Sequence, residues 1–428
     1  MSSPTPTRKA PLAGLAVAGL ALLALLGRGG PVVLAGLAVL VLVVASSYAE
    51  AARAGREIYR VRVERSAPQS AGEGVEVEVV LRARYLGSDP PSYIVLQDHP
   101  DRRLRPEGET GRVEPRPGEW VEMAYTLRPA PGLSKIRAIT IVSGDPLGLF
   151  TVRRTVELSS TVIVSPSPLH PGEPAGSGRP GKAEYVVAAA RGVSTEFYQL
   201  REYVPGDDVR LIHWPTTART GVPMVREGPQ TLSDDVALLL DLSAPSWPGT
   251  PGEAPADWIM RTALYIASSV AAAGGRVWAT ILRGEYWEEW DALRGRDAAE
   301  ILSSRLSRLG PDTAERKLGL ERAVSRLARR APAGAWTILL LGPATDLRSL
   351  ASALASAGLS GCRVMVALFT PLGGSRLEEL VRTAEEGYYR RAAGRLRELG
   401  VRSVLVTSHG GVVWVAREAA RLPLSRSC

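Results

Sequence analysis

Two apolar runs near the start of the chain constrain its fold more than any other feature. Pro11 to Leu26 and Pro31 to Ser47 are nearly free of charge and are separated only by Gly27-Arg28-Gly29-Gly30. Each run is close to the ~17–25 residues that a helix needs to cross a bilayer. A cleaved signal peptide is the alternative, but its apolar region is usually ~7–15 residues long and is not followed at once by a second run. The runs therefore predict a transmembrane helical hairpin over residues 11–49.

Basic residues indicate how this hairpin is oriented. Arg28 is the only charged residue of the turn between the runs. The basic residues that flank the hairpin are Arg8, Lys9, Arg53, Arg56, Arg60 and Arg62. Lys and Arg near membrane-spanning ends are enriched on the cytoplasmic side. We therefore expect a protein of the cell membrane whose residues 1–10, C-terminus and soluble body are all cytoplasmic.

The composition of the whole chain is that of a globular protein with several domains. The 428 residues are 45% hydrophobic and 22% charged, and ~100–200 residues per domain leave room for about two to four domains. The formal net charge is +8, but basic and acidic residues are interspersed, so we expect no nucleic-acid surface. The two cysteines and four histidines follow no zinc-ligand, disulfide-framework or catalytic-triad spacing.

Alternation with a period of two predicts an all-β domain over residues 57–166. Apolar and charged residues alternate from Ile58 to Glu64 and from Val75 to Arg82, which is typical of half-buried strands. Further strands are expected at 93–97, 120–127, 135–143 and 161–165. Short strands divided by Pro and Gly turns favour an immunoglobulin-like antiparallel sandwich. We expect this domain to be a spacer or a docking surface.

A dense polar segment at residues 184–232 allows two interpretations. The residues of this signature cluster are Glu196, Arg201, Tyr203, Asp207, Asp208, Arg210, Trp214 and Arg219. As many arginines as acids occur here, which favours a rigid ion-pair network with no catalytic residue. The alternative is a metal-dependent hydrolase in which Glu196, Asp207 and Asp208 hold a cation that activates water.

The same segment resembles the domain-of-unknown-function family DUF58. The matching residues are Glu196-Phe197, Leu200-Arg201-Glu202-Tyr203, Pro205-Gly206-Asp207-Asp208, Arg210, Ile212, Trp214, Ala218-Arg219 and Val225-Arg226-Glu227. Upstream, Gly144 to Phe150 and Val162 to Pro166 look like the family's approach to this signature. The chain departs from the pattern at His213 and Thr217, where the family tends to have Asp and Ser. The resemblance implies a non-enzymatic scaffold or adaptor that acts with a MoxR-type AAA+ ATPase in the assembly or maturation of other protein complexes.

Alternating strands and helices over residues 233–421 predict a doubly wound α/β domain. The expected strands are 236–243, 277–282, 336–341, 363–369 and 403–406, and the expected helices are 257–273, 298–309, 314–330, 347–357 and 376–399. Ligands of such sheets bind at the carboxyl ends of the strands. No Walker A or GxGxxG loop occurs at a strand-to-helix junction, which disfavours nucleotide binding by the common motifs.

Oxygen-bearing residues at these junctions resemble the metal-adhesion site of a von Willebrand factor A domain. That site uses an Asp-x-Ser-x-Ser loop, a Thr and an Asp. The corresponding residues in this chain are Asp241, Ser243, Thr313 and Asp346. Pro245 replaces the second Ser and Ser246 comes one residue late. The resemblance implies either a degraded Mg²⁺ site or a metal-free fold in which Asp241 and Asp346 are capping residues.

Overall fold

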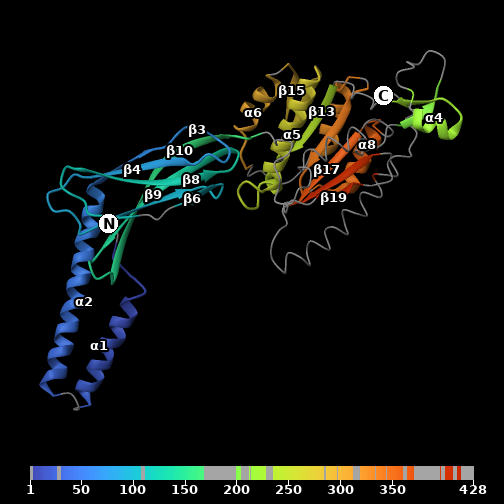
Figure 1. Ribbon diagram of the computed structural model, residues 1–428. Coiled ribbons are helices and arrows are strands. Elements are labelled where there is room, and N and C mark those ends of the chain that lie inside the picture. Colours follow the sequence, from blue (N-terminus) through green and yellow to red (C-terminus); the bar gives the residue numbers. More distant parts are fainter. Residues whose placement is uncertain are drawn as a thin grey trace. The chain divides into compact units, whose positions relative to one another are not determined.

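The computed structural model divides into two compact units, Met1–Val164 and Ser165–Cys428, which are described separately (Figure 1). The residues that the structure describes are 3–26, 30–107, 111–167, 199–203, 212, 214–227, 235–283, 286–295, 297–311, 319–332, 334–343, 345–359, 364–370, 396, 401–407 and 412–415.

Two apolar helices begin the first unit and lie side by side (Figure 1). Helix α2 (Pro31–Glu57), extended to Arg60 by the turn η1 (Ile58–Arg60), is long and apolar enough to cross a membrane by length and composition. Helix α1 (Ala10–Leu25) is apolar but has only 16 residues, which is shorter than such a span. Helix α2 continues past residue 49, where we expected the hairpin to end. Its C-terminal turns are amphipathic and bury Ala51, Ala54 and Gly55.

The described strands of this unit form two antiparallel sheets. The first has the order β2-β4-β8-β6 and consists of β2 (Val61–Ser66), β4 (Val77–Tyr85), β8 (Trp120–Pro129) and β6 (Leu104–Glu107). The second has the order β1-β10-β9-β5-β7, with β3 also paired to β10, and consists of β1 (Thr5–Pro6), β10 (Phe150–Ser165), β9 (Gly132–Gly144), β5 (Ile94–Pro100), β7 (Arg112–Val113) and β3 (Ser70–Gly72).

One apolar core joins the two sheets. Alternate residues of β4, such as Val79 and Leu81, are buried in the same cluster as Leu96 of β5 and Ile139 of β9. The sheets therefore pack face to face with period-two burial. The strands expected at 75–82, 120–127 and 135–143 correspond to β4, β8 and β9. The strand expected from Ile58 starts only at Val61, because Ile58–Arg60 still continue the helix as a 3₁₀ turn.

A mixed sheet forms the centre of the second unit. Its described strands have the order β15-β14-β13-β16-β17-β18-β19. Their bounds are β13 (Asp235–Asp241), β14 (Arg276–Arg283), β15 (Tyr286–Arg294), β16 (Trp336–Leu341), β17 (Val364–Thr370), β18 (Arg402–Thr407) and β19 (Val412–Val415). The inner strands are parallel, whereas β15 and β19 pair antiparallel at the two edges. The expected alternation of parallel strands and helices missed both edge strands.

Helices cover both faces of this sheet. They are α5 (Pro255–Ala272) and α6 (Ala298–Leu306) on one face, and α7 (Leu320–Arg330) and α8 (Leu347–Ser356) on the other. On β13, Leu238 and Leu240 pack against the first pair of helices, whereas Ala237 and Leu239 pack against the second. Burial on both faces explains why this strand is a continuous apolar run. The helix expected at 376–399 lies almost wholly outside the described residues.

Candidate functional site

The strand order of the mixed sheet reverses between β13 and β16. From β13 the chain proceeds outward to β14 and β15, and it then returns to place β16 on the other side of β13. Open α/β sheets bind ligands outside the carboxyl ends of their strands at such a point. Asp241 is the last residue of β13, and Gly342 directly follows β16. The two residues therefore lie at the position where a ligand of this sheet is expected.

Asp241 is buried at this position among neutral hydrogen-bond donors, with only 1% of its surface exposed. Its Oδ1 accepts from the backbone N–H of Ser243 at 3.1 Å and from the Ser243 hydroxyl at 2.5 Å. Its Oδ2 accepts from the Gly342 N–H at 3.1 Å. The Thr345 hydroxyl lies within reach of both the Gly342 carbonyl oxygen, at 3.0 Å, and the Asp241 carboxylate.

Burial dominates the electrostatics of Asp241. Desolvation raises the pKa of its carboxyl group above the ordinary value, and the hydrogen bonds from Ser243, Gly342 and Thr345 only partly oppose this effect. Among the described residues, no Arg or Lys forms an ion pair with it. A buried carboxylate in neutral surroundings is stabilised by taking up a proton or by binding a cation.

Ser246 adds a further oxygen to this site. The 3₁₀ turn η3 (Ala244–Ser246) buries Ser246 completely, and its Oγ has no hydrogen-bond partner among the described residues. A Cβ atom at position 342 would overlap this Oγ and would lie 3.1 Å from Asp241 Oδ2. The small size of Gly342 thus allows the two oxygens to approach the same point. Ser246 follows Pro245, the residue that stands where the metal-adhesion loop has its second Ser.

Asp346 has a different role from Asp241. It is the N-cap of α8, where Oδ1 accepts from the Arg348 N–H at 3.1 Å and Oδ2 accepts from the Ser349 N–H at 3.3 Å and the Ser349 hydroxyl at 2.7 Å. The Ser349 hydroxyl and these N–H groups lower the pKa of its carboxyl group. Capping is the role that one of the two sequence interpretations gave to Asp346, whereas Asp241, to which it gave the same role, is not a helix N-cap.

The structure describes only part of the predicted metal set. Thr313 lies outside the described residues. Within the described part, no group of three or more His, Cys, Asp or Glu side chains is placed to hold a metal ion. Thr345, which the predicted ligand set omitted, places its hydroxyl near the Asp241 carboxylate. In the sequence, the Thr345-Asp346 pair after the buried strand was the signal that could have indicated this hydroxyl.

Part of the signature cluster is visible as a small β-α-β unit. Strand β11 (Gln199–Glu202), which includes Arg201, pairs with β12 (Met224–Glu227), and the Tyr203 N–H donates to the Pro223 carbonyl oxygen at 2.8 Å. Between these strands, helix α4 (Trp214–Thr220) begins with Trp214, which is 67% exposed, and carries the exposed Arg219 in its last turn.

The rest of the signature cluster lies outside the described residues. These residues are Glu196, Asp207, Asp208 and Arg210. The ion-pair network and the hydrolase site both depend on them, so each stays a prediction.

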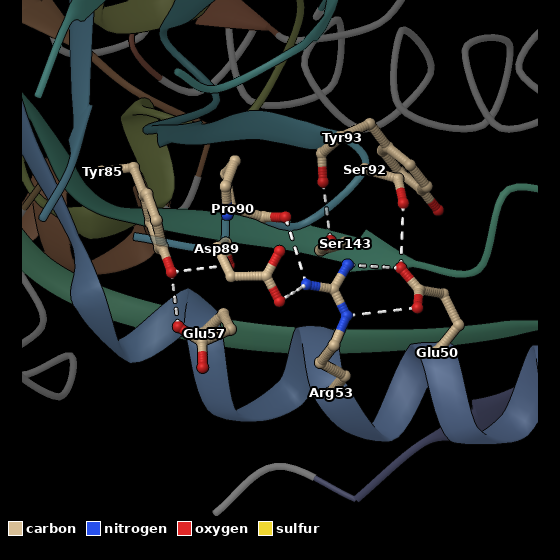
Figure 2. A network of polar contacts seen from close by, with 9 residues as sticks. All are labelled: Glu50, Arg53, Glu57, Tyr85, Asp89, Pro90, Ser92, Tyr93 and Ser143. Atoms are coloured by element: carbon tan, nitrogen blue, oxygen red, sulfur yellow. Dashed lines mark hydrogen bonds and ion pairs between the residues drawn. The ribbon is translucent and has the colours of Figure 1, made fainter. Parts of the chain in front are cut away.

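A second polar arrangement, which the sequence did not predict, joins α2 to the sandwich. This junction network consists of Glu50, Arg53, Glu57, Tyr85, Asp89, Pro90 and Ser92 (Figure 2). Arg53 donates to both carboxylate oxygens of Glu50, at 2.6 and 3.2 Å, to Asp89 Oδ2 at 2.5 Å and to the Pro90 carbonyl oxygen at 3.4 Å.

The remaining contacts of the junction network fix the loop between β4 and β5. Glu50 accepts from the Ser92 hydroxyl at 3.0 Å, and the Tyr85 hydroxyl lies 2.5 Å from Glu57 Oε2 and 2.7 Å from the Asp89 carbonyl oxygen. From the sequence alone, Arg53 is predicted only to be one of the basic residues that flank the membrane segment. In the structure it connects the end of helix α2 to the β-sandwich.

Comparison with known proteins finds a family model that matches part of the second unit. Residues 199–357 match the family described as "Protein of unknown function DUF58". This part of the chain is therefore similar to the DUF58 family. This DUF58 region runs from β11 through α8 and includes Asp241, Ser246, Gly342 and Thr345.

Other comparisons add little. No curated protein matches the chain. A crystal structure of the β-glucosidase from Listeria innocua in complex with glucose matches with 14% identity, a TM-score of 0.15, 24% coverage of this chain and 16% coverage of that enzyme. The chain thus spans a small part of that enzyme's length, and the match supports no conclusion about fold or function.

Proposed function

We propose that the protein is a membrane-anchored scaffold without catalytic activity of its own. The observation that carries this proposal is the continuity of α2. The helix begins in an apolar stretch long enough to span a bilayer and ends, without a break, in the core of the β-sandwich. The junction network holds its last turns against the loop between β4 and β5. Such a continuous helix fixes the orientation of the sandwich relative to its membrane anchor, which a flexible linker would not do.

The finer topology is part of the same proposal. We take α1 as a second, shorter span, which makes residues 11–49 a hairpin in the bilayer with both chain termini and the soluble body in the cytoplasm. The basic flanks support this orientation. The β-sandwich is proposed to be immunoglobulin-like, and the mixed sheet to be von Willebrand factor A-like. The second assignment is supported by the Asp-x-Ser turn at the point where the strand order reverses.

The Asp241 site fits a small hard cation such as Mg²⁺. The carboxylate of Asp241 and the hydroxyls of Ser243, Ser246 and Thr345 would hold it, since these are the oxygen ligands that such cations prefer. The ion would supply the positive charge that the buried carboxylate lacks. The unpartnered Oγ of Ser246 supports this assignment. In this proposal Asp346 remains a helix cap.

Calorimetric titration of the full-length protein in detergent with Mg²⁺ tests the cation site. We expect binding that is lost in Asp241→Ala and kept in Asp346→Ala, because only Asp241 faces the buried oxygens. Absence of heat in the natural protein would contradict the cation proposal and leave the sheet as a metal-independent docking surface.

A MoxR-type AAA+ ATPase is the proposed partner, on the basis of the family resemblance. Trp214 is our candidate contact, because a large aromatic side chain in the DUF58 region is left 67% exposed. Exposed aromatic residues are enriched at protein–protein contacts. The proposed activity is the support of assembly or maturation of other complexes.

Copurification of the membrane-reconstituted protein with the MoxR-type ATPase of the same organism tests the partner. We expect Trp214→Ala to reduce recovery of the ATPase, whereas Trp120→Ala, which removes a partly exposed tryptophan of the β-sandwich, should not. No association of the natural protein with this ATPase would refute the partner. Equal effects of both variants would refute the assigned surface.

A further inference from the structure

The turn between β9 and β10 is held by hydrogen bonds to Asp145 and presents an apolar tip. The Gly148 N–H donates to the Asp145 carbonyl oxygen at 3.0 Å, and the Phe150 N–H donates to Asp145 Oδ1 at 2.6 Å. Gly148 has a φ of +71°, a conformation that glycine adopts without strain. At the tip, Pro146 is exposed and Leu147 is 56% exposed.

This turn contacts the segment that leads into α1. Strand β1 (Thr5–Pro6) pairs with Phe150 and Thr151 at the start of β10. The Thr7 N–H then donates to the Leu149 carbonyl oxygen at 2.9 Å, and the Thr7 hydroxyl donates to the Gly148 carbonyl oxygen at 2.6 Å. The exposed Lys9 follows, and α1 begins at Ala10. The tip therefore lies beside the start of the first apolar helix.

The same turn also contacts α2 at the end of its apolar stretch. The ring of Phe150 packs edge-on against the ring of Tyr48, with 5.5 Å between centroids and an interplanar angle of 89°. Tyr48 directly follows the apolar run Pro31 to Ser47. A helix of that length rises about 25 Å, close to the ~30 Å hydrocarbon core of a bilayer. Tyrosine is enriched at the level of the lipid headgroups. Tyr48 at that level would bring the headgroups beside the β9–β10 turn, because its ring packs on Phe150.

We propose that the β9–β10 turn, with Leu147 at its tip, is a lipid-contacting surface that seats the β-sandwich on the bilayer. A lone exposed leucine is ordinary on a soluble surface, and the placement of Leu147 at the membrane level is what distinguishes it. The partly exposed Tyr48 would lie among the headgroups, where Lys9 would attract acidic lipids. This proposal rests on the proposed anchoring by α2. With the junction network, it gives the sandwich two attachments, which set its tilt.

Leu86 provides a matched control. It is 62% exposed in the loop after β4, and its N–H donates to the carbonyl oxygen of Arg60. Arg60 lies three helical turns beyond Tyr48 along α2 and η1. Leu86 is thus equally exposed and apolar, belongs to the same unit, and is held away from the level of Tyr48.

Spin labels on the full chain in phosphatidylcholine and phosphatidylglycerol vesicles test the proposal. Single cysteines replace Leu147, Leu86 or Val39 of α2 in a Cys362→Ser/Cys428→Ser background, and collisions with a water-soluble nickel reagent are measured. We expect protection of the Val39 label and loss of nickel collisions at Leu147, with collisions retained at Leu86. Charge is then tested by Lys9→Gln, which we expect to lower the protection of the Leu147 label in vesicles that contain phosphatidylglycerol but not in pure phosphatidylcholine vesicles. Equal protection with and without Lys9 in both vesicles would overturn the role of Lys9.

The outcomes separate the two proposals. A protected Val39 label with a nickel-accessible Leu147 label would overturn the lipid-contacting turn and leave the anchor intact. A nickel-accessible Val39 label would overturn the anchor itself. Equal protection at Leu147 and Leu86 would show that the vesicle shields the sandwich without selectivity, which also overturns the assigned surface.

Discussion

Two buried aspartates, one in each unit of the molecule, are stabilised in opposite ways. Asp98 of the sandwich is 3% exposed in its side chain and pairs with Arg65, whose side chain is fully buried. It also accepts from the Tyr125 hydroxyl at 2.6 Å. Asp241 of the mixed sheet is as deeply buried but is surrounded only by neutral donors. The comparison indicates a structural carboxylate in the first case and one open to a proton or a cation in the second.

The Asp98 arrangement joins the two layers of the sandwich. Arg65 of β2 donates from Nε to Asp98 Oδ2 at 2.9 Å, and also to the carbonyl oxygens of Ile136 and Leu158 and to the Ser160 hydroxyl. These partners come from the opposite sheet. Burial and the neighbouring Asp98 raise the pKa of the Tyr125 hydroxyl above its ordinary range, so it remains a donor. Each buried charge is thus compensated.

Breaking this pair should have the largest effect on stability. Arg65→Met leaves Asp98 buried without its cation, and we expect a loss of about 3–5 kcal/mol in the free energy of unfolding. Arg137→Met, which removes an exposed ion pair with Asp101, should cost less than ~1 kcal/mol. Urea unfolding of the full chain in detergent measures both. Equal effects would show that Asp98 is stabilised without Arg65.

Filling the space at Gly342 should have the next largest effect. In Gly342→Ala the new Cβ overlaps Ser246 Oγ, and we expect a loss of roughly 1–3 kcal/mol in chelator-treated protein. Ser246→Ala removes only an unpartnered hydroxyl, so it should be nearly neutral alone and should restore most of the loss in the double variant. Additive effects in the same unfolding assay would contradict the close approach of Ser246 and Gly342.

The pH dependence of Asp241 should follow from its raised pKa. Above the ordinary pKa of aspartate the unfolded chain has lost this proton while the folded chain still holds it, so stability falls as pH rises. The slope is about 1.4 kcal/mol per pH unit, starting near ~pH 4 and ending at the folded-state pKa. Asp241→Asn should remove this decline, as measured by unfolding over a pH series without divalent cations.

Asp346 supplies the control of opposite sign. Its lowered pKa means that it contributes stability above the unfolded-state value, and that this contribution is lost as the pH falls. Asp346→Asn should therefore remove a loss of stability that occurs as the pH falls, whereas Asp241→Asn removes a loss that occurs as the pH rises. The same slope in both variants would refute the distinction between the two carboxylates.

Removal of the α8 cap should have the smallest effect. Asp346→Ala loses the hydrogen bonds to the first turn of the helix, and we expect a cost of about 1 kcal/mol. Arg348→Ala, an exposed position in the same turn, should change stability by less than ~0.5 kcal/mol. Thermal unfolding of the two variants side by side measures the difference. A loss of Mg²⁺ binding in Asp346→Ala would assign this residue to the cation site instead.

Local pattern was sufficient for the elements with a clean hydrophobic signal. The strand predicted at 336–341 coincides with β16. A run of six mostly apolar residues that ends at a glycine is typical of a strand buried on both faces of a sheet. Strand β15 was missed because its charges interrupt the pattern. Those charges are satisfied by α7, where Arg326 and Arg330 pair with Glu289 at 2.7 and 2.9 Å. The same limit applies to Arg53, whose partner Asp89 lies 36 residues away.

The sequence by itself determined the apolar span, the period-two strands, the alternation of strands and helices, and the family signature. These features depend on hydrophobic burial, whose period is visible along the chain. Only the tertiary structure decided that Asp241 meets Gly342, 101 residues away, that Ser246 turns back to the same point, and that Arg65 reaches Asp98 across the sandwich. Hydrogen bonds and ion pairs act over ~3 Å between side chains that strand pairing brings together, and no local pattern records that pairing.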